Sequence, residues 1–105
     1  FLYVDDLADA CYFLMQRYDE TGLVNVGTGE DLNVKELALL VKEVVGFKGG
    51  LKFDSSKPDG TPRKLLDVSK LNALGWKFKT TLPEGLILAY EDFKKRLAKG
   101  DGALQ

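Results

Sequence analysis

Hydrophobic side chains recur at steps of three and four residues in three stretches of the chain, residues 7–18, 34–45 and 86–97. This period predicts three amphipathic helices, each with one apolar face. Asp5 or Asp6 is expected to cap the start of the first helix, because a carboxylate there accepts hydrogen bonds from free backbone N–H groups.

The second and third of these helices are expected to begin at a capping box. In this motif the side chain of the cap residue accepts a hydrogen bond from the backbone N–H of the third helical residue, and the side chain of the third residue accepts one from the backbone N–H of the cap. Asn33 and Glu36 form the first box, and Thr81 and Glu84 form the second. A further short helix is expected over residues 67–75, between an aspartate and a glycine. The pattern therefore predicts four helices with defined starts.

Three short apolar runs lie between these helices and are rich in β-branched and aromatic residues. Residues 1–4, 23–26 and 51–53 are accordingly expected to be strands. The predicted order is strand, helix, strand, helix, strand, loop, helix, helix, which is typical of an α/β fold. Residues 1–105 are interpreted as one domain, with residues 100–105 as a frayed tail.

The charges are distributed unevenly along the 105 residues. Residues 1–31 hold seven acids and one base, a net charge of −6, whereas the remaining 74 residues hold nine acids and 14 bases, a net charge of +5. No dense basic stripe with interleaved aromatic residues is present, so nucleic-acid binding is not expected. No apolar run approaches the roughly 20 residues that span a bilayer, so no membrane interaction is expected.

The chain has no histidine and one cysteine, Cys11. These counts exclude Cys/His zinc sites, the Ser-His-Asp triad and the Cys-His nucleophile from this sequence. A metal site is not expected. Cys11 lies on the apolar side of the first predicted helix, and the pattern predicts a buried thiol that behaves as a small hydrophobe.

Two motifs resemble cofactor or catalytic signatures and are better explained structurally. Residues 27–29, Gly-Thr-Gly, lack the third glycine of a dinucleotide-binding loop, since Leu32 stands at that position. Tyr90 and Lys94 match the Tyr-x-x-x-Lys pair of short-chain dehydrogenases. With four tyrosines and 12 lysines, about 0.5 such pairs are expected by chance. Tyr90 is interpreted as a core residue of the last helix, and no catalytic residue is assigned.

The polar segment 57–64 has a more specific chemistry. Lys57 begins a Lys-Pro-Asp-Gly turn that holds Asp59 on a rigid tip, and Arg63 and Lys64 follow closely. Three cations suit a diphosphate, and a fixed carboxylate suits neighbouring hydroxyl groups. These are the polar parts of a nucleotide, although a stiffened loop with solvated charges explains the same composition.

Four segments of the sequence resemble the C-terminal part of GDP-L-fucose synthases, members of the extended short-chain dehydrogenase/reductases. They are FLYVDDLADA at 1–10, NVGTGE at 25–30, KELA at 35–38 and SKPDGTPRKLLDVSKLNALGW at 56–76. The first two are widespread in that superfamily, whereas the last is specific to the synthases. The chain begins at Phe1 without Met, and with this resemblance it is interpreted as a fragment of a longer enzyme.

The resemblance implies an NADP-dependent enzyme that is both an isomerase and an oxidoreductase. Such an enzyme epimerises GDP-4-keto-6-deoxymannose at two carbons and then reduces the keto group to give GDP-L-fucose. NADP and the catalytic residues are expected to be supplied by the part that precedes this chain. By resemblance, Asp59 and Lys64 contact the GDP-sugar, at hydroxyl groups and diphosphate respectively, and Arg63 and Lys57 are weaker candidates.

The expected arrangement is a C-terminal substrate-binding lobe, with residues 1–50 packing partly on the cofactor domain. The intact enzyme is expected to be a cytoplasmic homodimer, and this chain alone is expected to be inactive and to self-associate. Two alternatives stay open: a lobe of another GDP- or UDP-sugar epimerase or dehydratase, and a free-standing binding module.

Overall fold

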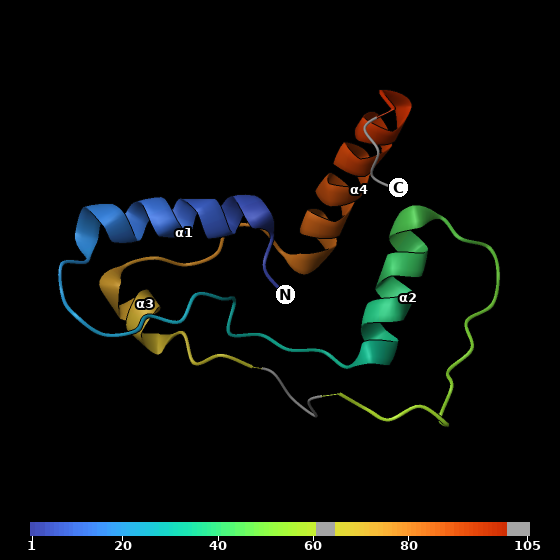
Figure 1. The fold of residues 1–105 in the computed structure, drawn as a ribbon, viewed down its shortest axis with the longest axis horizontal. Helices are drawn as coiled ribbons and strands as arrows, with labels where there is room; N and C mark the ends of the chain where they lie inside the picture. The colour runs from blue at the N-terminus through green and yellow to red at the C-terminus, as the bar shows by residue number, and fades with distance from the viewer. Residues whose placement is uncertain (61–64, 101–105) are drawn as a thin grey trace.

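The computed structural model describes residues 1–60 and 65–100, and their regular secondary structure consists of four helices. These are α1 (Val4–Arg17), α2 (Val34–Val45), α3 (Ser69–Leu74) and α4 (Leu82–Ala98). Figure 1 shows α1 lying beside α3, while α2 and α4 lie near one another at the other end of the molecule. The four predicted helices are therefore confirmed, with the first one beginning earlier than expected.

Local sequence explains the ends of α2 and α4. The Asn33 side chain accepts a hydrogen bond from the Glu36 N–H at 2.8 Å and donates one to the Glu36 carboxylate at 2.9 Å. The Thr81 hydroxyl accepts from the Glu84 N–H at 3.4 Å and donates to the Glu84 carboxylate at 2.8 Å. Gly46 ends α2 with φ +72°, a conformation that glycine adopts without a steric penalty. Both predicted cap residues are therefore confirmed, but each glutamate accepts from the side chain of the cap residue and not from its backbone N–H.

The predicted strand order is not confirmed. Among the residues that the structure describes, 1–3, 23–26 and 51–53 form no strand, and Val4 is the first residue of α1. A strand needs a neighbour to receive its backbone hydrogen bonds, and an isolated β segment is not stable in water. The β-prone composition of these segments is therefore not enough, because no second strand stands beside them in the described part of the chain.

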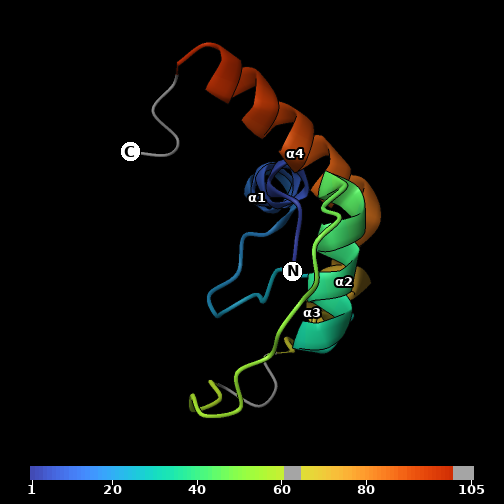
Figure 2. The same ribbon diagram turned by 90° about the vertical axis from the view of Figure 1, so that its right-hand side faces the viewer.

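The hydrophobic core joins α1, α3 and the residues that follow each of them. Ala10, Leu71 and Trp76 are buried at its centre. Partly buried hydrophobic side chains surround them: Leu2, Phe13, Leu14, Val24, Val26 and Phe78. The second contact between elements is between α2 and α4, which Figure 2 shows side by side. The described chain thus has one small core and a separate helix pair.

Two acids on the inner side of α1 attach the segment between α3 and α4 to this core. Asp6 is 5% exposed, and it accepts hydrogen bonds from the backbone N–H groups of Lys79 at 3.1 Å and Thr80 at 2.8 Å. Asp9 accepts a hydrogen bond from the Trp76 indole N–H at 2.8 Å and pairs with the Lys79 ammonium at 3.2 Å. Asp6 therefore does not cap α1, whose cap residue is Tyr3.

The Asp9 contacts predict a stability that depends on pH. The Trp76 indole N–H and then the Lys79 ammonium favour the carboxylate, so the folded-state pKa of Asp9 is below its usual value. A lowered pKa stabilises the fold above the unfolded-state pKa of about 3.9, and this stabilisation is lost as the pH falls through the folded-state pKa. Asp9→Asn is therefore expected to be less stable than the parent chain at pH 7, with a gap that closes below about pH 4.

Urea unfolding at a series of pH values from neutral to acid measures this gap in the free energy of unfolding. The other carboxylates titrate equally in both chains, so the difference reports Asp9. If the difference in the free energy of unfolding between the two chains stays constant over this pH range, the charge of Asp9 does not cause it. That result would contradict the assigned ion pair.

Candidate functional site

The described part of the predicted nucleotide-binding loop, residues 57–60, lies on the surface. Lys57 and Asp59 are exposed, whereas Arg63 and Lys64 lie outside the described residues. The loop is preceded by a local turn, in which the Asp54 carboxylate accepts hydrogen bonds from the hydroxyl and N–H groups of Ser56. The hydroxyl hydrogen bond is the main reason why the pKa of Asp54 is below its usual value. This turn lies at Ser55 and Ser56, and residues 58–60 form no hydrogen-bonded turn, so the predicted Lys-Pro-Asp-Gly turn is not confirmed. Lys57 and Asp59 are nevertheless exposed and accessible to a ligand.

The chain after the loop is anchored to residues 25–29. The Asn25 amide donates a hydrogen bond to the Asp67 carbonyl at 3.3 Å. Asp67 in turn accepts from the Ser69 N–H at 2.9 Å, which satisfies the start of α3 and lowers the pKa of this carboxyl. The prediction of Asp67 as the cap residue is wrong, because Val68 occupies that position, but the Asp67 carboxylate accepts from the first N–H of α3. This anchoring fixes the point at which the loop returns to the core.

The glycines of residues 27–29 take part in the same anchoring. A Cβ on Gly27 would lie 3.5 Å from a Val68 methyl carbon, and a Cβ on Gly29 would lie 2.9 Å from the other. Gly29 also has φ +77°. Gly29 therefore allows the backbone to approach Val68 closely, whereas a Cβ on Gly27 would make only an ordinary contact, and this agrees with a structural interpretation of the segment. They do not lead directly into a helix as a phosphate-binding loop would, because α2 begins only at Val34.

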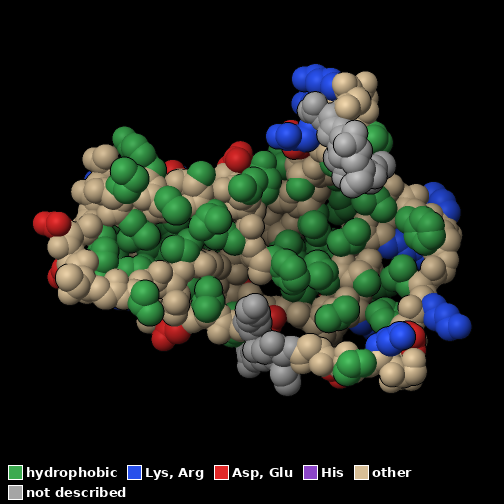
Figure 3. Space-filling view, in the orientation of Figure 1, with side chains coloured by type: hydrophobic (Ala, Val, Ile, Leu, Met, Phe, Trp, Pro, Cys, Tyr) green, Lys and Arg blue, Asp and Glu red, His purple; other side chains and the backbone are tan. Residues whose placement is uncertain are grey.

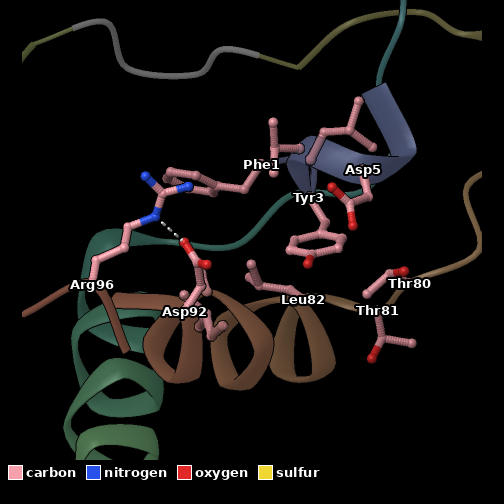
Figure 4. Close-up of a pocket in the computed structure, with 13 residues that line it drawn as sticks. Phe1, Tyr3, Asp5, Thr80, Thr81, Leu82, Asp92 and Arg96 are labelled. Atoms are coloured by element: carbon pink, nitrogen blue, oxygen red, sulfur yellow. Dashed lines mark hydrogen bonds and ion pairs between the residues drawn. The ribbon is translucent and has the colours of Figure 1, made fainter. Parts of the chain in front are cut away.

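A cavity of about 470 Å³ lies between the N-terminal residues and α4. Figure 4 shows Tyr3 and Asp5 facing Leu82 and the start of α4, with Asp92 and Arg96 at the other side. Most of its lining is apolar, contributed by Phe1, Leu2, Val4, Leu82, Leu86 and Ala89. Arg96 donates to Asp92 at 2.7 Å, so the charge pair at the rim is internally compensated. The cavity suits an apolar group better than an anion.

Tyr3 is the titratable group of this cavity with a shifted pKa. Desolvation and then the neighbouring Asp5 carboxylate raise the pKa of its hydroxyl. A raised pKa keeps the phenol protonated at neutral pH, which does not suit a general base. Gly85, buried in the first turn of α4, allows Tyr3 to approach, because a Cβ there would lie 3.2 Å from the Tyr3 Cβ. The cavity therefore depends on packing and carries no evident catalytic group.

The two residues with a catalytic resemblance have ordinary surroundings. Lys94 lies 4.7 Å from the centre of the Tyr90 ring and pairs with Glu91 at 2.8 Å. The hydrogen bond to Glu91 raises the pKa of Lys94, opposite to the shift of a lysine that gives up its proton. Tyr90 is half-buried. A cation over the ring face, rather than beside the hydroxyl, stabilises α4 locally.

The prediction of a buried Cys11 is wrong, because its thiol is exposed. The inner face of α1 instead contains Asp6, Ala10, Phe13 and Leu14. Periodicity could not predict which side of α1 is buried, because α1 has apolar residues on two sides. The buried side is the one that packs on Leu71 and Trp76, which lie far along the chain. The role of Asp6 was not predictable for the same reason. An aspartate in a first helical turn is ordinarily a charge near the helix dipole.

No metal site is found: in residues 1–60 and 65–100 no group of three or more Cys, Asp or Glu side chains is placed to hold an ion. Within the same residues, no helix has the length and apolar character needed to cross a membrane.

Comparison with known proteins gives a consistent result. No family model matches. The chain is 56% identical over 97 residues to GDP-L-fucose synthase 1 of Arabidopsis thaliana and 47% identical over 102 residues to GDP-L-fucose synthase of Escherichia coli. These matches span 92% and 89% of this chain but only 30% and 32% of the relatives. The chain therefore spans less than a third of the length of these relatives.

A solved structure agrees in fold. GDP-mannoheptose C4 reductase from Campylobacter jejuni, with NADP bound, matches 86% of this chain with a TM-score of 0.75 and 43% identity. The chain covers 29% of that protein. The fold is consistent with a fragment of the extended short-chain dehydrogenase/reductase fold. Over about nine-tenths of its length, this chain is a homologue of one segment of the GDP-L-fucose synthases.

Proposed function

We propose that this chain is the nucleotide-sugar-binding part of an NADP-dependent GDP-L-fucose synthase, and that the catalytic groups of that enzyme lie in other segments. The observation that supports this is the 97-residue match at 56% identity. A match of 97 residues within a chain of 105 must include the whole run 56–76, and this run contains the entire charged loop, residues 57–64. Cytoplasmic location and a homodimeric enzyme stay predictions.

The described residues do not fit NADP. Gly27 and Gly29 pack on Val68, and no glycine-rich dinucleotide loop occurs elsewhere in the sequence. No step through the cofactor is therefore assigned to this chain. In the proposed enzyme the cofactor supplies the hydride for reduction of the keto group, and its binding falls to other segments.

The role proposed for this chain is to bind the nucleotide end of the substrate. Lys57, Arg63 and Lys64 supply cations for the diphosphate, and Asp59 accepts hydrogen bonds from hydroxyl groups. Pro58 has a fixed backbone φ angle and directly precedes Asp59, which reduces the backbone entropy lost on binding. Binding energy at the nucleotide orients the distant sugar for proton and hydride transfer.

The proposal predicts that this chain can replace its counterpart in an active enzyme. In a chimera, residues 1–98 are substituted for the matching segment of the E. coli synthase, to which the chain is 47% identical. The chimera is expected to convert GDP-4-keto-6-deoxymannose to GDP-L-fucose with NADPH, measured by product chromatography, while the isolated chain gives no turnover. A folded chimera without activity would contradict the proposal.

Within this chimera, Asp59→Ala and Lys64→Ala are expected to raise the KM for the GDP-sugar by about 10-fold or more and to leave the KM for NADPH unchanged. Loss of a charged hydrogen bond of roughly 1.5–3 kcal/mol has this effect. Glu43→Ala on the exposed side of α2 is the control. Equal increases in both KM values would indicate a structural role for the loop.

A second candidate function is suggested by the match to GDP-mannoheptose C4 reductase. A chain of that kind would bind a GDP-mannoheptose for reduction at C4. Activity of the chimera cannot distinguish the two candidate functions, because the E. coli part performs the chemistry. The affinities of the chimera for the two GDP-sugars must therefore be compared. Tighter binding of a GDP-heptose than of the 6-deoxyhexose would favour this second candidate. Equal binding of GDP- and UDP-sugars would favour another nucleotide-sugar enzyme.

A further inference from the structure

Asp59 is followed by Gly60, and this pair is the only Asp-Gly sequence in the described part of the chain. A second pair, Asp101 and Gly102, lies outside the described residues. The side-chain carboxyl carbon of an aspartate and the backbone nitrogen of the next residue can close a five-membered ring. A glycine after the aspartate favours this closure, because it has no Cβ to block the approach and its backbone turns freely.

Neither reacting group of this pair is engaged by the fold. Asp59 and Gly60 are exposed, and residues 58–60 form no helix, strand or turn. In the described residues, no hydrogen bond or ion pair engages the Asp59 carboxylate or the Gly60 N–H. A Cβ built on Gly60 meets no atom within 4 Å. The carboxyl carbon and the nitrogen are therefore free to rotate toward each other.

The pair also lies away from the core. Figures 1 and 2 show residues 46–60, which follow α2, descending to the lower edge of the molecule, below the four helices. Figure 3 shows charged side chains of both signs on that edge. Exposed loop segments of this kind change conformation at little cost in free energy. The backbone rotation that ring closure needs is consequently not opposed by packing.

Asp54, in the same segment, has the opposite arrangement. Its carboxylate accepts hydrogen bonds from the hydroxyl and N–H groups of Ser56, and these hydrogen bonds lower the pKa of Asp54. Ring closure expels a carboxyl oxygen as water, so it is favoured by the protonated carboxyl group, which these hydrogen bonds disfavour. The next residue, Ser55, also carries a Cβ. Asp54 is therefore a natural reference for the reactivity of Asp59.

We propose that Asp59 and Gly60 are a site of spontaneous isoaspartate formation, by which the nucleotide-binding loop loses its correctly placed carboxylate with time. The Gly60 nitrogen bonds to the side-chain carboxyl carbon of Asp59, and the carboxyl hydroxyl group leaves as water with the amide proton. Water then adds to the main-chain carbonyl carbon of Asp59, and the bond from that carbon to the nitrogen breaks. The main chain afterwards runs through the former side chain. Water is the only co-reactant, and nothing is oxidised or reduced.

The consequence for binding rests on the proposed function, in which Asp59 accepts hydrogen bonds from hydroxyl groups of the substrate. Isoaspartate adds one carbon to the main chain and places the carboxylate directly on the Cα. The accepting oxygens are thereby displaced from the position in which they meet the ligand. A misplacement of about 1 Å can cost roughly 100-fold in rate. The modified loop is therefore expected to bind the GDP-sugar more weakly, while the core is unchanged.

Incubation of the isolated chain at neutral pH and physiological temperature tests the modification itself. Peptide mapping with electron-transfer fragmentation distinguishes isoaspartate from aspartate, which has the same mass. We expect isoaspartate at Asp59 to accumulate at least about 10-fold faster than at Asp54, because Gly60 has no Cβ and because hydrogen bonds hold Asp54 as the carboxylate.

Gly60→Ala is the matched variant, since the space around Gly60 accepts a methyl group and its φ is not positive. It is expected to slow isoaspartate formation at Asp59 without removing the carboxylate. Equal rates at Asp59 and Asp54, or an unchanged rate at Asp59 in Gly60→Ala, would overturn the inference.

Kinetics of the E. coli chimera during the same incubation test the consequence for binding. The rate at a GDP-sugar concentration far below KM is expected to fall in proportion to the isoaspartate fraction at Asp59, whereas the rate at saturating GDP-sugar falls less. The Gly60→Ala chimera is expected to keep its aged rates close to its own fresh rates. Unfolding with age would lower both rates together, and an equal loss in both chimeras would overturn the assigned effect on binding.

These outcomes separate the inference from the proposed function. Isoaspartate at Asp59 without any change in the rates supports the modification site and contradicts a role of Asp59 in substrate binding. A chimera in which Asp59→Ala raises the KM for the GDP-sugar, but in which Asp59 does not isomerise, supports the function and overturns the modification site.

Discussion

Replacing Leu71 by alanine is expected to remove most of the stability of the isolated chain. Leu71 has no exposed surface and lies between Ala10 and Trp76 at the centre of the only cluster of buried residues in the described parts of the chain. A buried Leu→Ala change costs about 3–5 kcal/mol, through lost apolar transfer and the cavity that is left. Natural domains have total stabilities of about 5–15 kcal/mol, and a core this small favours the lower end.

Urea unfolding followed by the fluorescence of Trp76, the single tryptophan, measures this loss directly in the core. Leu88→Ala is the matched control, since Leu88 is 47% exposed on α4. Its expected cost is below about 1 kcal/mol. Equal losses for the two variants would mean that the packing around Leu71 does not hold the fold together.

Replacing Asp6 by alanine is expected to cost about 3 kcal/mol. The change leaves the partly buried N–H groups of Lys79 and Thr80 without their acceptor, and each unsatisfied buried group costs about 1–3 kcal/mol. The Thr80 hydroxyl loses the same partner, at 3.3 Å. The segment that orients α4 against α1 is thereby released.

The neighbouring Asp5 provides a matched control for Asp6. Both acids lie in the first turn of α1, so both interact with the helix dipole, but Asp5 is exposed. Asp5→Ala is expected to cost about 0.3–1 kcal/mol. Asp6→Asn should retain most of the stability, because its amide oxygen still accepts from the backbone. Thermal and urea unfolding of the three variants measure these differences, and similar losses for Asp5→Ala and Asp6→Ala would contradict the anchoring role.

Local signals in the sequence predicted the helices well. Capping boxes at Asn33 and Thr81 and the glycines after α2 and α3 act within a few residues, so a sequence contains their whole physical cause. The polar composition of residues 57–60 correctly predicted an exposed Asp59, but the predicted Lys-Pro-Asp-Gly turn is not seen, and the turn lies two residues earlier at Ser55 and Ser56.

Features that depend on distant partners were not predictable. Residues 23–26 have a strand composition, yet a strand forms only beside another strand. Only one of the two apolar faces of α1 is buried, and it is the face that packs on Leu71 and Trp76, in a distant part of the chain. Asp6 is buried because of Lys79 and Thr80, 73 and 74 positions later. Periodicity identifies a face but not the element that covers it.

Helix α2 has a consequence for the motions of the molecule. It has no buried residue, its packing is with α4, and it is joined to the rest of the described chain by long irregular segments on both sides. Opening of α2 therefore exposes little additional apolar surface and requires little free energy, whereas opening of α1 disrupts the core. The charged loop follows α2 in the chain, so the element that leads into the proposed nucleotide-binding segment is also the one that unfolds locally at the lowest cost.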